Sequence, residues 1–95
     1  MLKKHVHFVG IGGMGMSAIA RIMLERGYTV SGSDLRSTEL TESLERMGAT
    51  IYQGHAREHL GGAEMVVYSS AVPGDNPELS AAKQSKITIL HRADA

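Results

Sequence analysis

Short apolar runs alternate with amphipathic segments along most of this 95-residue chain. The first run, residues 6–9, ends at Gly10 and is typical of a buried strand. Between residues 14 and 26 the apolar positions recur at helical spacing, and Gly27 can adopt the left-handed conformation that ends a helix. The pattern therefore predicts a strand, a glycine-rich loop and a helix at the start of the chain.

A second helix is predicted from its cap and its stop signal. Ser37 or Thr38 can cap its first turn, and Gly48 can end it. Its expected apolar stripe consists of Leu40, Leu44 and Met47.

The later part of the chain continues the alternation. Further apolar runs predict strands at residues 28–33, 49–52, 64–68 and 87–90. Asn76 followed by Pro77 predicts the cap and first position of a third helix, which ends near residue 84. Residues 53–62 are too few and too polar for a full crossover helix, so we expect a loop or one turn there, and residues 92–95 look like the beginning of another element.

Strands and helices that alternate at these intervals form parallel sheets with right-handed crossovers and helices on both faces. The expected fold class is α/β, a Rossmann-like three-layer sandwich with a five-stranded parallel sheet. No linker, repeat or low-complexity tract divides the sequence, which predicts a single domain over residues 1–95. Because a new element begins where the sequence stops, we expect a fragment of a longer protein.

Composition narrows the function classes. Ten Lys and Arg balance ten Asp and Glu, so the formal net charge is zero. A nucleic-acid binder normally carries a basic excess, and a binder of single strands also carries aromatic side chains on which bases stack. This sequence has no basic excess, and its aromatic residues are only three Tyr and one Phe. It has no cysteine and no apolar run long enough to cross a membrane. We expect a cytoplasmic protein with neither nucleic acid nor membrane as a partner.

The glycine-rich loop is the first candidate for chemistry. Residues 10–15 read Gly-Ile-Gly-Gly-Met-Gly, which fits G-x-G-x-x-G between a predicted strand and a predicted helix. In such loops Gly10 would permit the tight turn, Gly12 would let the backbone approach a diphosphate, and Gly15 would let the helix pack closely on the strand. The free N–H groups of the first helical turn would bind the phosphates. The alternative is a purely structural turn.

Polar residues also follow the other predicted strands. Asp34 closes the second strand. In dinucleotide-binding folds an acidic residue at this position accepts hydrogen bonds from a ribose and would repel the 2′-phosphate of NADP. The alternative is that Asp34 only caps a helix or forms a turn. Gly54 and His55 follow the third strand, and residues 69–74 follow the fourth. Because ligands bind at the carboxyl ends of parallel strands, His55 and the second loop could donate hydrogen bonds to phosphate or sugar oxygens, or form ordinary polar turns.

Other patterns support weaker hypotheses. Residues 55–59 match the zinc-protease pattern H-x-x-E-H, but glycines on both sides disfavour the helix it needs, so we expect no metal site. Residues 80–83 match S-x-x-K without its partner motifs, and Lys83 is expected on a solvated helix face. His5 and His7 are expected on one face of the first strand. The sequence has no Gly-Lys dipeptide and hence no Walker A loop.

Five blocks of sequence, in order and at family-like spacing, resemble the UDP-N-acetylmuramate–L-alanine ligases of peptidoglycan synthesis, in the Mur ligase family. The blocks are residues 7–17 around the glycine loop, 30–34 (Val-Ser-Gly-Ser-Asp), 54–55 (Gly-His), 69–72 (Ser-Ser-Ala-Val) and 76–78 (Asn-Pro-Glu). The related ligase that reattaches recycled tripeptide normally lacks the Gly-Ile-Gly-Gly start and ranks lower. Met14, Ala18 and Thr88 depart from the family pattern and are expected to adjust packing and, at Met14, the shape of the loop.

The resemblance implies the UDP-sugar-binding N-terminal domain of a three-domain ligase. In that family a central domain with its own P-loop binds ATP and Mg²⁺, and a C-terminal domain helps to bind nucleotide and amino acid. The lactyl carboxylate of UDP-N-acetylmuramate becomes an acyl phosphate, from which the amine of L-alanine displaces phosphate. The implied partners are UDP-N-acetylmuramate and the remaining domains of the same chain, and neither a catalytic residue nor a cofactor or metal is implied within residues 1–95.

The resemblance also implies substrate-binding residues, position by position. The diphosphate would be held by Gly12, Gly13, Met14 and Gly15. The uridine would be flanked by Asp34, Leu35 and Arg36, with Asp34 on the ribose or uracil. Its surroundings and those of the diphosphate would be completed by His55, Ser69, Ser70, Ala71 and Val72.

Two other functions stay open on the residues alone. The glycine loop and Asp34 also suit an NAD-binding domain of an oxidoreductase. A regulatory nucleotide-binding domain without enzymatic activity would use the same loop.

Overall fold

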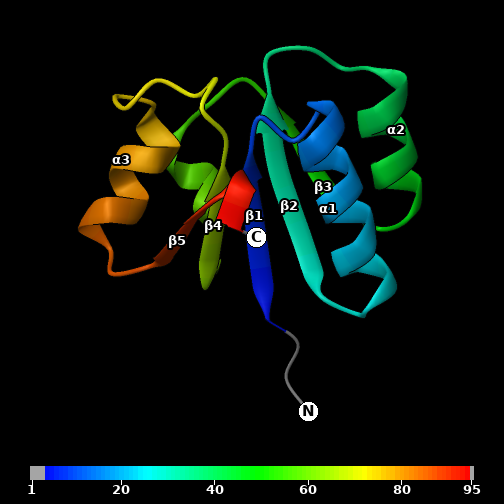
Figure 1. The fold of residues 1–95 in the computed structure, drawn as a ribbon, viewed down its shortest axis with the longest axis horizontal. Helices are drawn as coiled ribbons and strands as arrows, with labels where there is room; N and C mark the ends of the chain where they lie inside the picture. The colour runs from blue at the N-terminus through cyan, green and yellow to red at the C-terminus, as the bar shows by residue number, and fades with distance from the viewer. Residues whose placement is uncertain (1–3, 95) are drawn as a thin grey trace.

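The computed structural model describes residues 4–94 and holds a five-stranded parallel sheet in the order β3-β2-β1-β4-β5 (Figure 1). The strands are β1 (His5–Val9), β2 (Thr29–Asp34), β3 (Thr50–Gln53), β4 (Met65–Tyr68) and β5 (Thr88–His91). The α-helices are α1 (Met14–Glu25), α2 (Glu39–Arg46) and α3 (Pro77–Gln84), and the short 3₁₀ helices are η1 (Arg57–Leu60) and η2 (Arg92–Asp94). The predicted fold class and the predicted strands and helices are confirmed.

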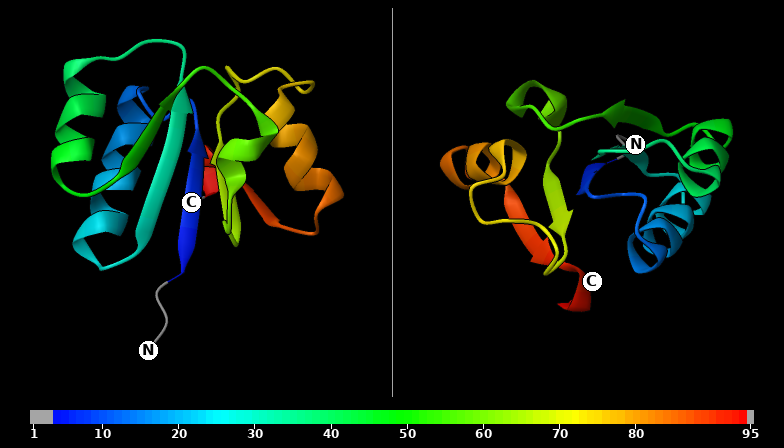
Figure 2. Two further views of the ribbon diagram at one scale, coloured as in Figure 1. Left: turned by 180° about the vertical axis from the view of Figure 1, so that it is seen from behind. Right: turned by 90° about the horizontal axis from the view of Figure 1, so that it is seen from above.

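Helices cover both faces of the sheet, which gives three layers (Figure 2). On one face α1 and α2 pack on a core that includes Phe8, Met16 and Leu44. On the other face η1 and α3 pack on a smaller core of Val9, Leu60, Val66 and Ala82.

The central strand β1 places apolar side chains on one face of the sheet and two histidines on the other. Val6 and Phe8 point into the α1–α2 core, as alternation along a strand requires. His5 and His7 point to the opposite face, where both hydrogen-bond to Ser31 Oγ at 2.7 Å. The two histidines therefore share one face of the strand, as predicted, and their face carries a polar network beside the smaller core.

The helix ends follow the sequence signals. Gly27 and Gly48 have φ of +88° and +110°, the left-handed conformation that lets a glycine follow the last helical turn. Thr38, one of the two expected caps of α2, accepts a hydrogen bond from the Thr41 N–H, and Thr41 Oγ1 accepts one from the Thr38 N–H in return. Asn76 caps α3 with Pro77 at the first position.

The predicted apolar stripe of α2 is wrong in part. Leu44 is buried, but Leu40 and Met47 are 41% and 38% exposed. Thr41 is fully buried in place of a larger apolar residue, because the glycine loop lies close to it: a Cβ on Gly12 would approach Thr41 Cγ2 to 3.3 Å.

The segments 53–62 and 92–95 also match their predictions. The segment after β3 contains a single 3₁₀ turn, η1, and the chain beyond β5 begins another 3₁₀ turn, η2. Ala95 lies outside the described residues. Within residues 4–94, no helix has the length and apolar character needed to cross a membrane.

Candidate functional site: a cleft at the carboxyl edge of the sheet

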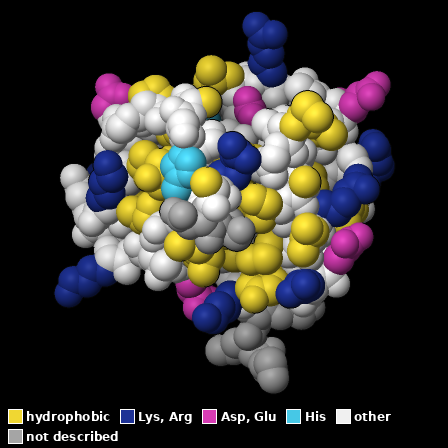
Figure 3. Space-filling view, in the orientation of Figure 1, with side chains coloured by type: hydrophobic (Ala, Val, Ile, Leu, Met, Phe, Trp, Pro, Cys, Tyr) yellow, Lys and Arg dark blue, Asp and Glu magenta, His cyan; other side chains and the backbone are white. Residues whose placement is uncertain are grey.

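A cleft of about 880 Å³ opens at the carboxyl ends of the strands, the upper edge in Figure 1. The segments after all five strands line it, through Gly10, Asp34, His55, Ser69 and Arg92 among others. This is the edge at which open parallel sheets bind ligands. Basic and acidic side chains are scattered over the face seen in Figure 3 and do not gather there into a patch of one charge.

The glycine loop is anchored to the end of β2. Gly10 has a φ of +80°, and the N–H groups of Gly10 and Ile11 both donate to the Ser33 carbonyl, at 2.8 and 2.9 Å. The Ile11 side chain is fully buried and lies over Gly32, where an added Cβ would come within 2.5 Å of Ile11 Cδ1. The expected tight turn at Gly10 is therefore confirmed, and a second glycine on the neighbouring strand makes room for it.

Gly12 contacts Asp34 directly. Its N–H donates to Asp34 Oδ2 at 2.8 Å, and an added Cβ would lie only 2.7 Å from the same oxygen. The other carboxylate oxygen accepts the N–H of Leu35 at 2.8 Å. Asp34 thus neither caps a helix nor points freely into the cleft; it ties the glycine loop to β2 and keeps further lone pairs for a ligand.

The side chain nearest to the last glycine of the loop is Arg92. A Cβ on Gly15 would lie 2.9 Å from Arg92 Nη1. The absence of a side chain at Gly15 therefore lets a guanidinium from the end of β5 lie against the first turn of α1.

The first turn of α1 presents free backbone donors to the cleft. Within residues 4–94, the N–H groups of Met14, Gly15 and Met16 make no hydrogen bond, whereas those of Gly12 and Gly13 are bound by Asp34 and the Gly10 carbonyl. Free N–H groups at a helix start, together with the positive end of the helix dipole, attract anions. Arg92 lies against this turn and adds a positive charge to the cleft lining.

The structure brings most of the predicted site residues together. Those that line the cleft are Gly13, Met14, Gly15, Asp34, Leu35, His55, Ser69, Ser70, Ala71 and Val72. Gly12 lies behind this lining, bound to Asp34, and the side chain of Arg36 is exposed and does not line the cleft. The roles of all these residues toward a ligand stay predictions.

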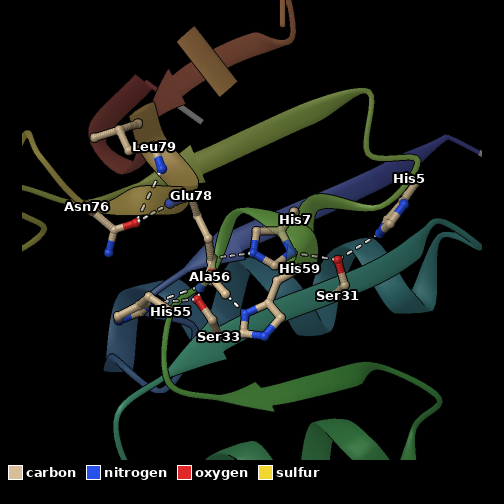
Figure 4. A network of polar contacts seen from close by, with 10 residues as sticks. All are labelled: His5, His7, Ser31, Ser33, His55, Ala56, His59, Asn76, Glu78 and Leu79. Atoms are coloured by element: carbon tan, nitrogen blue, oxygen red, sulfur yellow. Dashed lines mark hydrogen bonds and ion pairs between the residues drawn. The ribbon is translucent and has the colours of Figure 1, made fainter. Parts of the chain in front are cut away.

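A buried carboxylate, Glu78, follows the cleft-lining residues Asn76 and Pro77 and lies at the centre of a polar network (Figure 4). Its Oε1 accepts hydrogen bonds from His7 Nε2 and Ser33 Oγ, both at 2.6 Å. Its Oε2 accepts the Ala56 N–H at 3.1 Å and His59 Nδ1 at 2.7 Å. Groups from β1, β2 and η1 thus converge on one side chain at the start of α3.

Hydrogen bonds keep this carboxylate ionised. Burial alone would raise the pKa of Glu78, but the hydrogen bonds from His7, Ser33 and His59 outweigh it and lower the pKa from 4.5 to about 2. Since an ionised carboxylate only accepts hydrogen bonds, each neighbour must present a proton to it. Burial, helped by the nearby His7, lowers the pKa of His5 at the other end of the network.

Only faint signals in the sequence point to this network and to Arg92. Glu78 belongs to the Asn-Pro-Glu block and lies in the first turn of α3. Acidic residues are favourable in the first turn of any helix, so its position alone does not indicate a buried network. His55 and His59 are the ends of the H-x-x-E-H pattern, and both lie near Glu78: their Nδ1 atoms are 3.7 and 2.7 Å from Glu78 Oε2. Within the described residues, no group of three side chains is placed to hold a metal.

Comparison with known proteins assigns the family. Residues 5–95 match the model described as "Mur ligase family, catalytic domain". The chain belongs to the Mur ligase family. This confirms the resemblance carried by the five sequence blocks.

Individual members of the family are close in sequence and structure. The UDP-N-acetylmuramate–L-alanine ligase of Methylobacillus flagellatus is 58% identical over 90 residues, which are 95% of this chain and 19% of that protein. The crystal structure of the UDP-N-acetylmuramate-alanine ligase of Thermotoga maritima superposes with a TM-score of 0.90 at 37% identity, over 94% of this chain and 21% of that one. A UDP-N-acetylmuramate:L-alanyl-gamma-D-glutamyl-meso-diaminopimelate ligase of Neisseria meningitides gives 0.86 at 26% identity, over 96% and 29%. The chain thus spans about a fifth of the length of the curated relatives it matches.

Proposed function

We propose that this chain is the UDP-sugar-binding part of an ATP-dependent ligase that joins L-alanine to UDP-N-acetylmuramate in peptidoglycan synthesis. The observation that carries the proposal is the convergence of three free N–H groups and Arg92 on one cleft, in a chain of the Mur ligase family. The identity of 58% to a ligase named for L-alanine supports that amino acid over the tripeptide used by the more distant relative.

The cleft suits a nucleoside diphosphate. Its phosphates would lie on the N–H groups of Met14, Gly15 and Met16, where the helix dipole and the Arg92 guanidinium oppose their charge. The nucleoside would then extend toward Asp34 and Leu35, with the loop of residues 69–72 on its other side. In this arrangement Gly12 acts indirectly, by holding Asp34 in place, and Arg36 would contact uridine only if its exposed side chain turns toward the cleft.

The remaining parts of the reaction are assigned to the rest of a longer protein. ATP and Mg²⁺ would bind there, because the sequence has no G-x-x-x-x-G-K-[ST] loop of its own. The substrate carboxylate would be activated as an acyl phosphate and attacked by the amine of L-alanine, without a catalytic group from these residues. Since UDP-N-acetylmuramate is a polar nucleotide sugar, we place this protein in the cytoplasm.

Calorimetric titration of the chain with UDP-N-acetylmuramate, UDP and NAD tests the proposal. We expect UDP-N-acetylmuramate and UDP to bind and to compete for one site, with no heat from NAD at the same concentration. Binding of NAD in the absence of binding by either uridine nucleotide would contradict the proposal and favour an oxidoreductase or a regulatory domain.

A further inference from the structure

The position of His55 suggests a specific role in the cleft. Its side chain is 19% exposed and lines the cleft, while Nδ1 faces inward, 2.8 Å from Ser33 Oγ (Figure 4). No residue in the described part of the chain bonds to Nε2, and no buried side-chain nitrogen or oxygen there lacks a partner. Nε2 is therefore reached by solvent and is available to a ligand.

The hydrogen bonds behind His55 fix which nitrogen carries its proton. Ser33 has one hydroxyl proton, and Glu78 Oε1, an ionised oxygen 2.6 Å away, takes it. Ser33 Oγ can then only accept from His55, so Nδ1 must be the protonated nitrogen of the neutral ring. Nε2 is left with a lone pair and acts as a hydrogen-bond acceptor.

We propose that Glu78 and Ser33 are positioning residues that hold His55 as a hydrogen-bond acceptor for the nucleoside of the bound nucleotide. The inference rests on the proposed function for the presence of a uridine nucleotide. It changes the expected role of His55, which in this form accepts from a donor group and does not donate to a phosphate oxygen. The uracil imide N–H and the ribose hydroxyls are the nucleoside groups that can supply such a proton.

The tautomer of His55 is the first test. Histidine in water favours the Nε2–H tautomer, whereas the structure requires Nδ1–H. Long-range ¹H–¹⁵N correlation spectra of the ¹⁵N-labelled chain above pH 7 should show the Nδ1–H form for His55, and Ser33→Ala should return it toward Nε2–H. A wild-type His55 that is Nε2–H or doubly protonated under these conditions overturns the inference.

Ligand binding is the second test, with substitutions that separate the two ring nitrogens. Asparagine places its amide near Nδ1, so His55→Asn can keep the Ser33 contact and loses the acceptor; we expect UDP to bind about three- to tenfold more weakly. His55→Gln, with its amide near Nε2, should recover part of this loss. Arg57→Gln is the control, because Arg57 is exposed and does not line the cleft, and it should leave the affinity for UDP unchanged.

UDP analogues identify the donor. N3-methyl-UDP lacks the imide proton, and 2′-deoxy-UDP and 3′-deoxy-UDP each lack one ribose hydroxyl. One of these three analogues should bind wild type three- to tenfold more weakly and show no further loss in His55→Asn. An analogue that loses as much affinity in His55→Asn as in wild type lacks a contact to another group, such as Asp34. The inference is overturned if no analogue loses less affinity in His55→Asn than in wild type.

Failure of the inference and failure of the proposed function give different results. Equal binding of UDP by wild type and His55→Asn overturns the inference and leaves the proposed function standing. If wild type binds no UDP although His55 is in the Nδ1–H form, the proposed function is overturned. The assignment of a nucleoside partner to His55 is then overturned as well.

Discussion

Two adjacent residues on β2, Gly32 and Ser33, determine how the cleft is built. Gly32 leaves room for the buried Ile11 side chain, which fixes the glycine loop on the sheet. The Ser33 carbonyl accepts two N–H groups of that loop, while its hydroxyl joins His55 to Glu78. The loop at the start of α1 and the carboxylate at the start of α3 are therefore positioned from the same end of one strand.

Gly32→Ala should destabilise the fold. The new Cβ would lie 2.5–2.7 Å from Ile11 Cδ1 and Cβ, so the loop must move away from the sheet. We expect the free energy of unfolding, measured with urea, to fall by about 1–3 kcal/mol. Gly62→Ala is the matched control because nothing lies within 4 Å of its added Cβ; an equal loss in both variants would contradict the steric explanation.

Glu78 should make stability depend on pH in the acidic range. Its pKa of about 2 in the folded chain is below the ordinary 4.5, so its contribution is present above pH 4.5 and is lost as the pH falls toward 2. Between pH 5 and 3 this amounts to about 2 kcal/mol of unfolding free energy.

Urea unfolding of Glu78→Gln over the same pH interval checks this prediction. The variant should be less stable at neutral pH and should lose less stability than wild type between pH 5 and 3. Glu58→Gln is the control, since Glu58 is 75% exposed and should follow the wild-type profile. A Glu78→Gln variant with the pH profile of wild type would refute the assignment of a strongly depressed pKa.

At the scale of elements, local sequence signals predicted most of the fold. Glycine stops, the Asn-Pro start of α3 and apolar runs act within a few residues, so they can be recognised without knowing the tertiary structure. Two features that the sequence did not predict depend on contacts between distant segments. The buried face of α2 depends on the contact of Thr41 with the glycine loop, and the surroundings of Gly15 depend on the contact of Arg92 with α1. The Glu78 network joins residues as far as 71 positions apart, as in its bond to His7, which no local pattern encodes.

The start of α3 depends on a single cap. Asn76 Oδ1 accepts the N–H groups of Glu78 and Leu79 at 2.9 and 3.2 Å. Asn76→Ala should therefore lower the free energy of unfolding by about 1 kcal/mol, measured by urea titration followed by circular dichroism. Asn76→Ser, which keeps a capping oxygen, should lose less than half as much, and an equal loss in both variants would show that the cap is not the cause.

Arg92 follows β5 and lies against the start of α1, where we expect it to contact the phosphates of a bound nucleotide. Arg92→Gln is expected to weaken the binding of UDP on the order of tenfold at low salt, because a charge-assisted contact is removed. Uridine, which has no phosphate, should bind both proteins equally. Arg57→Gln removes an exposed arginine that does not line the cleft and should bind UDP like wild type; the same affinity in Arg92→Gln would place the phosphates elsewhere.

At the scale of the whole molecule, all five strands bring polar groups to one edge of the sheet. A net charge of zero is compatible with a diphosphate ligand, because backbone N–H groups and one arginine supply the positive potential locally. The chain covers about a fifth of the ligases it resembles. The function proposed above assigns to it the nucleotide end of the substrate.

Mapping the bound ligand by amide chemical shifts tests this account most directly. Titration of the ¹⁵N-labelled chain with UDP-N-acetylmuramate should move the amide signals of Met14, Gly15 and Met16 most strongly, followed by those of Leu35 and His55. NAD at equal concentration should leave these signals in place. Shifts at the start of α1 with NAD, and none with UDP-N-acetylmuramate, would contradict the assignment of the cleft to a UDP-sugar.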